Sequence, residues 1–341
     1  MGDGQNRPDL TRFKNEEEIE RYLDYVRFIV AYFKGRIKYY EIWNEPNVPA
    51  SDSPWGQIAF EDYIRLLKRV APVIREVDPD AKIVVGAVSG VWRSGYPGYG
   101  EWARHNLDIN YLEALASSDV MPLVDGISWH PFYCTRADDS YYQAYPQTVD
   151  EIKQIAWEHG FRGIFISEEI SWRTPDVDSN SDLQPFDELI VTKYLIRSVV
   201  VHRGLDVMVG ISMGESTSSR GVPSRDQAIA TLNTIMAGAM PTNEQLKVQV
   251  ESESSLDTEN YSFFFPGDNK MIAIWTDGLP VENAIGEKFN IILKDITAKK
   301  ITAIDVLYGV QQQLNWQQVN HDIHIFNIRI RDYPLFIIFS N

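Results

Sequence analysis

Glu41-Ile42-Trp43-Asn44-Glu45-Pro46-Asn47 joins the end of an apolar run to a carboxylate and a proline. The run from 37 to 43 is short and rich in β-branched and aromatic residues, and Pro46 has no N–H for a β-ladder. We therefore predict a buried strand that stops near Glu45. In a barrel of parallel strands, catalytic groups gather where strands open into loops in this way. Asn, Glu and Pro are also common in turns, so a plain surface turn is the alternative.

The segments around this stretch alternate between helical and strand-like patterns. Apolar residues at helical spacing follow a capping-box-like start at Asn15 and continue to Gly35. Further amphipathic segments are expected at 60–77, 109–116, 149–159, 186–200 and 226–240, and short apolar runs at 82–88, 124–129, 163–167 and 205–211. Alternation of this kind predicts parallel βα units with buried strands, which is an α/β fold.

From 249 onward the pattern changes to short strand-like runs without helices between them. These runs lie at 261–265, 271–275, 289–293, 301–308, 323–328 and 335–339. Strands that follow one another with only turn residues between them predict an all-β sandwich. We therefore expect a barrel-type catalytic domain at 1–241 and a β-sandwich domain at 242–341.

The composition is that of an ordinary globular chain of 341 residues, with 44% hydrophobic and 23% charged residues. A formal net charge of −16 argues against nucleic acid and polyanionic glycans as partners and favours neutral ligands. The single cysteine, Cys134, excludes an intramolecular disulfide. No stretch has the length of a membrane span and no signal peptide is recognised, so no membrane partner is expected.

The Trp-Asn-Glu-Pro-Asn string at 43–47 resembles the acid/base motif on the fourth barrel strand of the clan A glycoside hydrolases. The preceding sequences Tyr25-Val26-Arg27-Phe28 and Phe33-Lys34-Gly35-Arg36 are most similar to the family 39, β-xylosidase-type branch. The resemblance implies a (β/α)8 TIM barrel and β-glycosidase activity. It also implies that Glu45 is the proton donor and that Asn44 binds the 2-hydroxyl of the sugar.

Five strand-like runs are counted in the barrel-type domain, whereas a closed barrel of this type has eight. If the strand before Glu45 is the fourth, as the resemblance implies, the five runs are strands 4–8 and the first three are missing. An open five-stranded sheet would expose an apolar edge. We therefore expect either an N-terminal segment of a longer gene product or an oligomer to complete the barrel. Such a precursor could carry a secretion signal, so the compartment is left open between extracellular and other locations.

A second carboxylate at the end of a strand is expected at 163–169, where an apolar run leads to Ser167-Glu168-Glu169. Retaining glycoside hydrolysis needs a nucleophilic carboxylate about 5 Å from the acid. The run resembles the family's seventh-strand pattern, in which Thr or Ser precedes the nucleophile, and this likeness assigns the role to Glu168. Because side chains alternate along a strand, only one of Glu168 and Glu169 can face the cavity. A solvated acidic turn is the alternative.

This mechanism makes different demands on the two carboxylates. Glu45 must be protonated when the substrate arrives, so we expect burial and the negative charge of Glu168 to raise its pKa. Glu168 must be ionised in order to attack the anomeric carbon. Glu45 then acts as a base toward water, which gives net retention of configuration.

A histidine and three aromatic residues complete the candidate site. By the resemblance, His130 lies near the sugar at the end of the sixth strand and Tyr133 hydrogen-bonds the nucleophile, although many relatives have this Tyr where the chain has Phe132. Trp43 and Trp172 are candidate sugar platforms, because aromatic faces stack on the apolar faces of pyranose rings. For His130 and for each Trp, packing in the core is the alternative role.

Other chemistries find less support in the sequence. The six histidines include no His-Glu-x-x-His pair, which disfavours a metal hydrolase. No glycine-rich phosphate loop or dinucleotide fingerprint follows a strand, so no cofactor is expected. The serious alternative is a non-catalytic carbohydrate-binding remnant, or an inactive fragment, of such a glycosidase. The sequence leaves open which neutral oligo- or polysaccharide is the substrate and whether cleavage is exo or endo.

Overall fold

The computed structural model describes residues 15–47, 58–90, 109–132, 135–172, 186–211, 224–242, 246–251, 256–265 and 269–340. The chain divides into two compact units. The first comprises 1–132 with 144–169, and the second comprises 133–143 with 170–341. Each unit is described by itself below, and the expected domain boundary at 241 stays a prediction.

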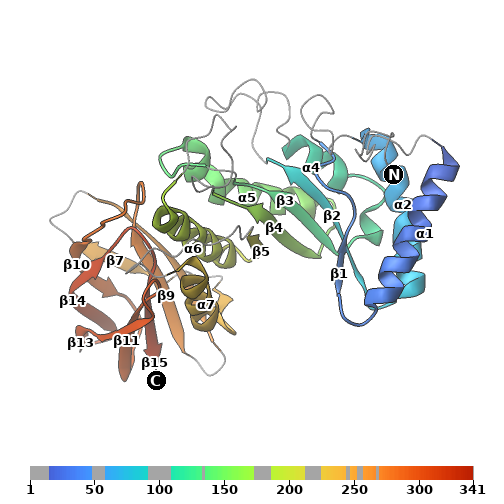
Figure 1. The fold of residues 1–341 in the computed structure, drawn as a ribbon. Coiled ribbons are helices and arrows are strands. Elements are labelled where there is room, and N and C mark those ends of the chain that lie inside the picture. Colours follow the sequence, from blue (N-terminus) through green and yellow to red (C-terminus); the bar gives the residue numbers. More distant parts are fainter. Residues whose placement is uncertain are drawn as a thin grey trace. The chain divides into compact units, whose positions relative to one another are not determined.

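The first unit consists of alternating helices and parallel strands (Figure 1). In chain order these are α1 (Glu16–Phe33), β1 (Tyr39–Glu41), α2 (Phe60–Val77), β2 (Lys82–Ser89), α4 (Ile109–Ala116), the 3₁₀ turn η1 (Met121–Leu123), β3 (Gly126–His130) and nearly all of α5 (Ser140–Glu158) and β4 (Ile164–Ile170). The strands β1 to β4 pair in parallel in the order of the chain. The parallel strands and their helices form part of a (β/α) barrel, which confirms the expected α/β fold of barrel type.

Local sequence explains the first helix. The side chain of Asn15 caps α1 by accepting a hydrogen bond of 2.9 Å from the backbone N–H of Glu18, and acidic residues fill the first turn, where the helix dipole favours them. The apolar stripe of α1 packs against α2. Its buried members are Ile19, Leu23, Val26 and Val30. The apolar residues that recur at helical spacing in the sequence are therefore the residues that α1 buries on one face.

Alternation of side chains gives the strands two different faces. Trp129 of β3 is buried on the helix side, and its indole N–H donates to the Tyr145 hydroxyl of α5 at 2.8 Å. Residues one position away point to the opposite, inner face. On that face Glu41 pairs with Val84, and Val84 pairs with Gly126.

β1 ends at Glu41, before the expected end near Glu45. The reason is that Trp43 and Glu45 have φ values of 74° and 46°, in the left-handed region that a regular strand does not use. The backbone N–H of Glu45 still donates to the carbonyl of Ala87 at 3.1 Å. Glu45 is therefore held at the carboxyl end of β1 beside β2, as expected.

The second unit begins with two helices and continues as β-sheets. Its elements are α6 (Glu188–Gly204), β5 (Met208–Ile211), α7 (Arg225–Met236), β6 (Met240–Pro241), β7 (Val248–Glu251), β8 (Thr258–Phe264), β9 (Lys270–Thr276), β10 (Glu287–Leu293), β11 (Lys300–Asp305), β12 (Val310–Gln313), β13 (Asn315–Val319), β14 (Asp322–Ile330) and β15 (Leu335–Ser340). Two antiparallel sheets have the strand orders β13-β14-β10-β7 and β12-β11-β15-β9-β8-β6. Isoleucine, leucine and phenylalanine side chains of both sheets form a common core, which confirms the expected sandwich. No helix in the described part of the chain is long and apolar enough to cross a membrane.

Buried charges fasten α6 to the sandwich sheets. Lys193 is 1% exposed, and its Nζ lies 2.8 Å from a carboxylate oxygen of Asp332. Arg197 donates to the carbonyl oxygens of Asp332, Gly278 and Thr276 at 2.9, 2.7 and 3.2 Å. Because buried charges are tolerated when they are paired and hydrogen-bonded, this network fixes α6 in one position on the sandwich.

Candidate active site

The carboxyl ends of the strands in the first unit carry a strained backbone. Four non-glycine residues there have φ values of 74°, 46°, 43° and 49°, namely Trp43, Glu45, Ala87 and Glu169. Ala87 lies in a bulge of β2, where the register with β3 shifts. Backbone strain of this type costs about 1–3 kcal/mol per residue and tends to cluster at functional sites.

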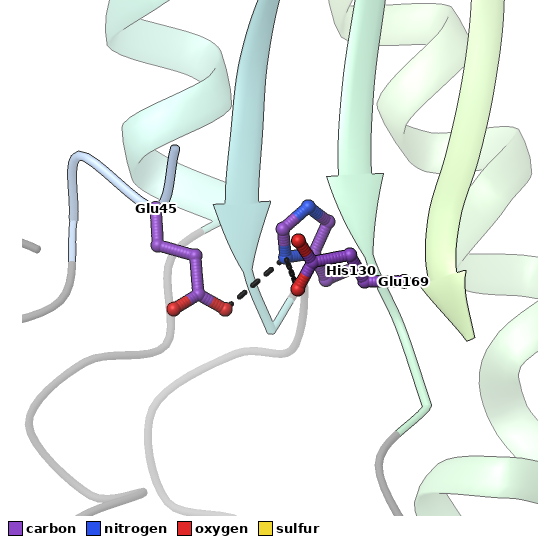
Figure 2. Close-up of side chains that lie close together, drawn as sticks. All are labelled: Glu45, His130 and Glu169. Atoms are coloured by element: carbon purple, nitrogen blue, oxygen red, sulfur yellow. Dashed lines mark hydrogen bonds and ion pairs between the residues drawn. The ribbon is translucent and has the colours of Figure 1, made fainter. Parts of the chain in front are cut away.

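His130 connects two of the carboxylates at this edge. The residue is 8% exposed, and its Nδ1 lies 3.1 Å from Oε1 of Glu45 and 3.5 Å from Oε2 of Glu169. Figure 2 shows both carboxylates turned toward this one ring nitrogen. A neutral imidazole has a single N–H, so it can donate to only one carboxylate at a time unless the ring or a carboxyl group gains a proton.

The environment of Glu45 differs from the one expected. Burial raises the pKa of Glu45, but the hydrogen bond and charge of His130, with a further hydrogen bond from Ser89, outweigh burial and lower the pKa overall. The expectation of a raised pKa is therefore wrong for this state of the protein. The reason is that Nδ1 of His130 faces the Glu45 carboxylate, an arrangement that no pattern in the sequence indicates.

Glu45, His130 and Glu169 each offer an atom within 4.8 Å of the others, as a metal site would require. However, Nδ1 of His130 already interacts with both the Glu45 and the Glu169 carboxylate. We therefore interpret the cluster as a hydrogen-bonded network. The other nitrogen, Nε2, is buried and has no hydrogen-bond partner within the described part of the chain.

Glu168 has a different set of contacts from Glu169. Its carboxyl group is hydrogen-bonded to that of Glu41, and Glu41 also accepts a short hydrogen bond from the Ser128 hydroxyl. Oε1 of Glu168 is buried and lacks a hydrogen-bond partner among the described residues. A buried acceptor without a partner is unusual in a native fold.

Strand register relates Glu168 to His130. Trp129 of β3 pairs with Ser167 of β4, so His130 and Glu168 follow as the next neighbours. Both lie on the inner face, since Trp129 points to the helices. The structure thus places Glu45 against His130, and His130 on the strand beside Glu168.

The remaining predicted site residues lie in different environments. Asn44 is exposed, and Trp43 is half-buried beside it. Trp172 belongs to the second unit, where it is 4% exposed, stacks on Tyr194 with ring centroids 4.8 Å apart, and donates to the carbonyl of Thr135 at 2.8 Å. This placement is that of a packed core residue, so a role of Trp172 in sugar binding stays a prediction.

Tyr133, the expected partner of the nucleophile, lies outside the described residues. Its neighbour Phe132 is buried and packs on Tyr145, with ring centroids 4.5 Å apart. Phe132 therefore has a packing role and does not replace Tyr133.

Sequence reasoning missed two members of this edge, Glu41 and Ser128, and set a third, Glu169, aside in favour of Glu168. A signal for the first two was present. Glu41 lies four residues before Glu45, and Ser128 lies two before His130, so each shares a strand face with a predicted site residue. The expectation that only one of Glu168 and Glu169 faces the site does not hold, because the left-handed backbone of Glu169, with a φ of 49°, turns its carboxylate toward His130 while Glu168 contacts Glu41.

A hollow in the first unit lies elsewhere. It has a volume of about 500 Å³ and is lined by residues at the amino ends of the strands, among them Tyr39, Lys82, Asp125, Phe161 and Ile164. Glu45, His130 and Glu168 follow or lie near the carboxyl ends of the strands instead. Because active sites of parallel barrels form at the carboxyl ends, we do not assign this hollow to the site.

Similar proteins are found among enzymes that act on glycans. The chain is 33% identical to Endo-1,4-beta-xylanase A of Thermotoga neapolitana over 117 residues. This alignment covers 33% of the chain and 10% of the xylanase. A family 39 glycoside hydrolase from the gut symbiont Bacteroides cellulosilyticus WH2 aligns with a TM-score of 0.59 and 18% identity, over 96% of this chain and 63% of that one. A family 44 endoglucanase produced by Clostridium acetobutylium ATCC 824 aligns with a TM-score of 0.60 and 11% identity, over 93% and 70% of the two chains.

The chain has the fold of these glycoside hydrolases. The expected likeness to clan A, with a family 39 enzyme among the similar structures, is confirmed at the level of the fold. No protein-family model matches the chain. It spans a tenth of the length of the xylanase and 63% of the family 39 structure.

Proposed function

We propose that this chain acts as a retaining β-glycosidase that cleaves the O-glycosidic bonds of a neutral oligo- or polysaccharide. Glu45 is the acid/base and Glu168 is the nucleophile. The observation that carries the proposal is the common placement of the two glutamates. Both lie at the carboxyl edge of parallel strands, and His130 on β3 is near Glu45 and on the strand next to Glu168. The similar fold of known glycoside hydrolases supports it.

The first step transfers the sugar to the protein. The Glu168 carboxylate attacks the anomeric carbon and forms a glycosyl ester, while the bond to the leaving oxygen breaks and Glu45 gives that oxygen its proton. We assign the attack to Oε1 of Glu168, the oxygen that has no hydrogen-bond partner among the described residues. In the second step Glu45 takes a proton from water, and the water oxygen displaces Glu168 from the anomeric carbon.

Glu45 must gain a proton before the first step, although His130 lowers its pKa. A bound sugar adds burial at the half-buried Glu45 carboxyl, and burial disfavours the charged form. A hydroxyl that attracts Nδ1 of His130 would also weaken the hydrogen bond that stabilises the carboxylate. Substrate binding thus shifts Glu45 toward the protonated form that the reaction needs.

The remaining proposed substrate contacts come from Asn44, Trp43, His130, Tyr133 and Trp172. Asn44 is exposed next to Glu45, where its amide can both donate to and accept from a sugar hydroxyl. Nε2 of His130 is a further group that a hydroxyl can engage. A neutral glycan is preferred because the net charge of −16 and the carboxylates at the site repel polyanions.

A non-catalytic carbohydrate-binding protein is the second candidate. The lowered pKa of Glu45 favours it, because an ionised carboxylate held by His130 accepts hydrogen bonds from sugar hydroxyls but cannot donate a proton. The two candidates make opposite predictions about turnover.

Hydrolysis of a panel of aryl β-glycosides by the full chain tests the proposal, with Glu45→Ala, Glu168→Ala and Glu169→Ala variants assayed alongside. We expect Glu45→Ala to reduce kcat/KM by about 10²–10⁴-fold, as loss of a general acid does, and Glu168→Ala to abolish turnover. Azide should restore a β-glycosyl product to Glu45→Ala and an α-glycosyl product to Glu168→Ala. The matched control Glu169→Ala should keep turnover within about tenfold.

Two other outcomes would contradict the proposal. An azide-dependent α-glycosyl product from Glu169→Ala, with turnover retained by Glu168→Ala, would make Glu169 the nucleophile. Absence of turnover from the folded chain, combined with calorimetric binding of neutral oligosaccharides, would establish the binding protein instead.

A further inference from the structure

We propose that Glu41 is a positioning residue for the nucleophile: its protonated carboxyl group donates a hydrogen bond to Glu168 and keeps Glu168 ionised and oriented. This inference rests on the proposed function of Glu168. It adds a third carboxyl group, held neutral, to the two carboxyl groups that glycoside hydrolysis requires.

Strand pairing places Glu41 on the same face as the proposed nucleophile. Glu41 pairs with Val84, Val84 with Gly126, and Gly126 with Ile164. Glu168 lies four positions after Ile164 on the same strand, so its side chain returns to the face that Glu41 occupies. Register therefore places the two side chains on one face, and on that face the carboxyl group of Glu41 is hydrogen-bonded to that of Glu168.

Ser128 determines which oxygen of Glu41 can carry a proton. The Ser128 hydroxyl accepts a hydrogen bond of 2.8 Å from the backbone N–H of Ala87, which leaves its own proton free to donate. It donates to Oε1 of Glu41 in a short hydrogen bond, whereas its other acceptor, the carbonyl of Val85, is 3.3 Å away. Oε1 of Glu41 is thus an acceptor, and the acidic proton belongs on Oε2.

A hydrogen bond between two carboxyl groups requires a proton on one of them. Glu41 is the group favoured to hold it: burial raises its pKa most, contact with Glu168 raises it further, and the pKa reaches about 9. As a whole residue Glu41 is exposed, but its carboxyl group is engaged by both Ser128 and Glu168, and it is the burial of this group that raises the pKa. Glu169 also raises this pKa through its charge.

The other titratable groups near the pair come from three elements. They are Glu45 after β1, His130 on β3 and Tyr63 on α2. The Tyr63 hydroxyl donates to the carbonyl of Ile42 at 3.0 Å and accepts from the N–H of Gly86 at 3.1 Å, so its proton is already engaged. Nδ1 of His130 faces Glu45 and Glu169. The donor to Glu168 is therefore assigned to Glu41.

A neutral acid that donates to Glu168 has two consequences. It stabilises the carboxylate form, since a hydrogen bond to the charged form favours that form. It also fixes the carboxylate plane, because we assign the contact to Oε2 of Glu168; the other oxygen, Oε1, has no hydrogen-bond partner in the part of the chain that is described. Oε1 then remains available to attack.

Substitution of Glu41 by Gln and by Leu tests the proposal. Gln keeps a neutral donor for Glu168 and an acceptor for Ser128, whereas Leu keeps neither. In the full chain labelled with ¹³C at the Glu carboxyl carbons, NMR titration should reveal one carboxyl group that stays protonated at pH 7. This signal should be absent from Glu41→Gln.

The pH profile of kcat/KM then separates positioning from a merely structural role. We expect Glu41→Gln to keep kcat/KM within about threefold and to leave the acidic limb unmoved. Glu41→Leu should lose about tenfold or more, and its acidic limb should move to higher pH, because Glu168 loses the donor that favours its ionised form.

Two results would overturn the inference. One is a titration in which every Glu carboxyl group is ionised at pH 7 in the folded chain. The other is an acidic limb that moves equally in both variants. The titration does not depend on turnover, so an inactive chain that retains the protonated carboxyl group would refute the proposed function while leaving the shared proton of Glu41 established.

Discussion

A buried cationic side chain in the second unit and a buried histidine in the first unit are paired in different ways. In the second unit, Lys193 is 1% exposed and donates to Asp332, which also accepts from the N–H of Val281 at 2.7 Å. In the first unit, the carboxylates of Glu45 and Glu169 share one histidine nitrogen. Opposite charges and backbone groups thus complete the network around Lys193, while like-charged groups meet around the histidine.

The first arrangement stabilises the fold, whereas the second is typical of a functional site. The Lys193 network joins elements distant in sequence, and every hydrogen bond in it reduces the cost of burial. The edge of the half-barrel keeps strained backbone at Glu45 and Glu169 and leaves Oε1 of Glu168 without a partner among the described residues. Such features cost stability and are expected where a ligand supplies the missing contacts.

Replacement of Asp332 by Ala should have the largest effect on stability. It would leave Lys193 as an uncompensated buried charge and remove the acceptor for the Val281 N–H. Loss of one partner of a buried pair costs about 3–5 kcal/mol, and we expect a decrease of this size in the free energy of unfolding. Urea denaturation, followed by hydrogen exchange of the sandwich strands, measures it.

Lys247→Ala is the matched control within the same unit. Lys247 and Asp295 form an ion pair of 3.7 Å in which the side chains are 78% and 76% exposed. Pairs of this kind contribute about 0–1 kcal/mol. If Asp332→Ala were as mild as Lys247→Ala, the contrast between the two units would not hold.

Much of the fold could be predicted from periodicity, and the failures have physical causes. The apolar runs of β2, β3 and β4 are fully or largely buried, so their sequences carry a clear signal. The strand β12 is exposed along its whole length and β13 nearly so, and both consist mostly of Asn and Gln residues that show no alternation. An edge strand that buries no face has no pattern to read.

The candidate site was predictable in its motifs but not in its pairings. The resemblance placed His130 near the sugar on which Glu45 acts, but it did not predict the contact between the two side chains. The contact between Glu41 and Glu168 depends on strand register, which a single sequence does not reveal. The approach of Glu169 to His130 depends on a φ of 49°, which only the folded chain displays.

Ser128→Ala should have an intermediate effect, and it tests whether the edge is held by hydrogen bonds as the second unit is. The change removes the acceptor of the Ala87 N–H and the donor to Glu41. A buried N–H left without an acceptor costs about 1–3 kcal/mol, so the free energy of unfolding should fall by that amount.

The control is Ser117→Ala in the same unit, because the Ser117 hydroxyl makes one exposed hydrogen bond of 3.0 Å to the carbonyl of Ala114. Its effect should lie within about 0.5 kcal/mol, as for other surface substitutions. Equal effects of the two serine variants in urea denaturation would mean that Ser128 does not support this edge.

The smallest expected effect is a shift in pH dependence when His130 is replaced by Phe. His130 lowers the pKa of Glu45 through its hydrogen bond and charge, so its removal should raise that pKa. Glu45 would then remain protonated to higher pH. Because the basic limb of kcat/KM reports the proton donor, this limb should move to higher pH, and ¹³C titration of the Glu45 carboxyl should move in the same direction.

His159→Phe serves as the control for this last change, since His159 is exposed near the end of α5. Its profile should match that of the unchanged chain. A basic limb that moves to lower pH in His130→Phe, or a Glu45 titration that does not move at all, would show that the 3.1 Å contact between His130 and Glu45 does not control the proton. The edge would then be polar, but His130 would not set the pKa of Glu45. The contrast with the Lys193 network would then say nothing about function.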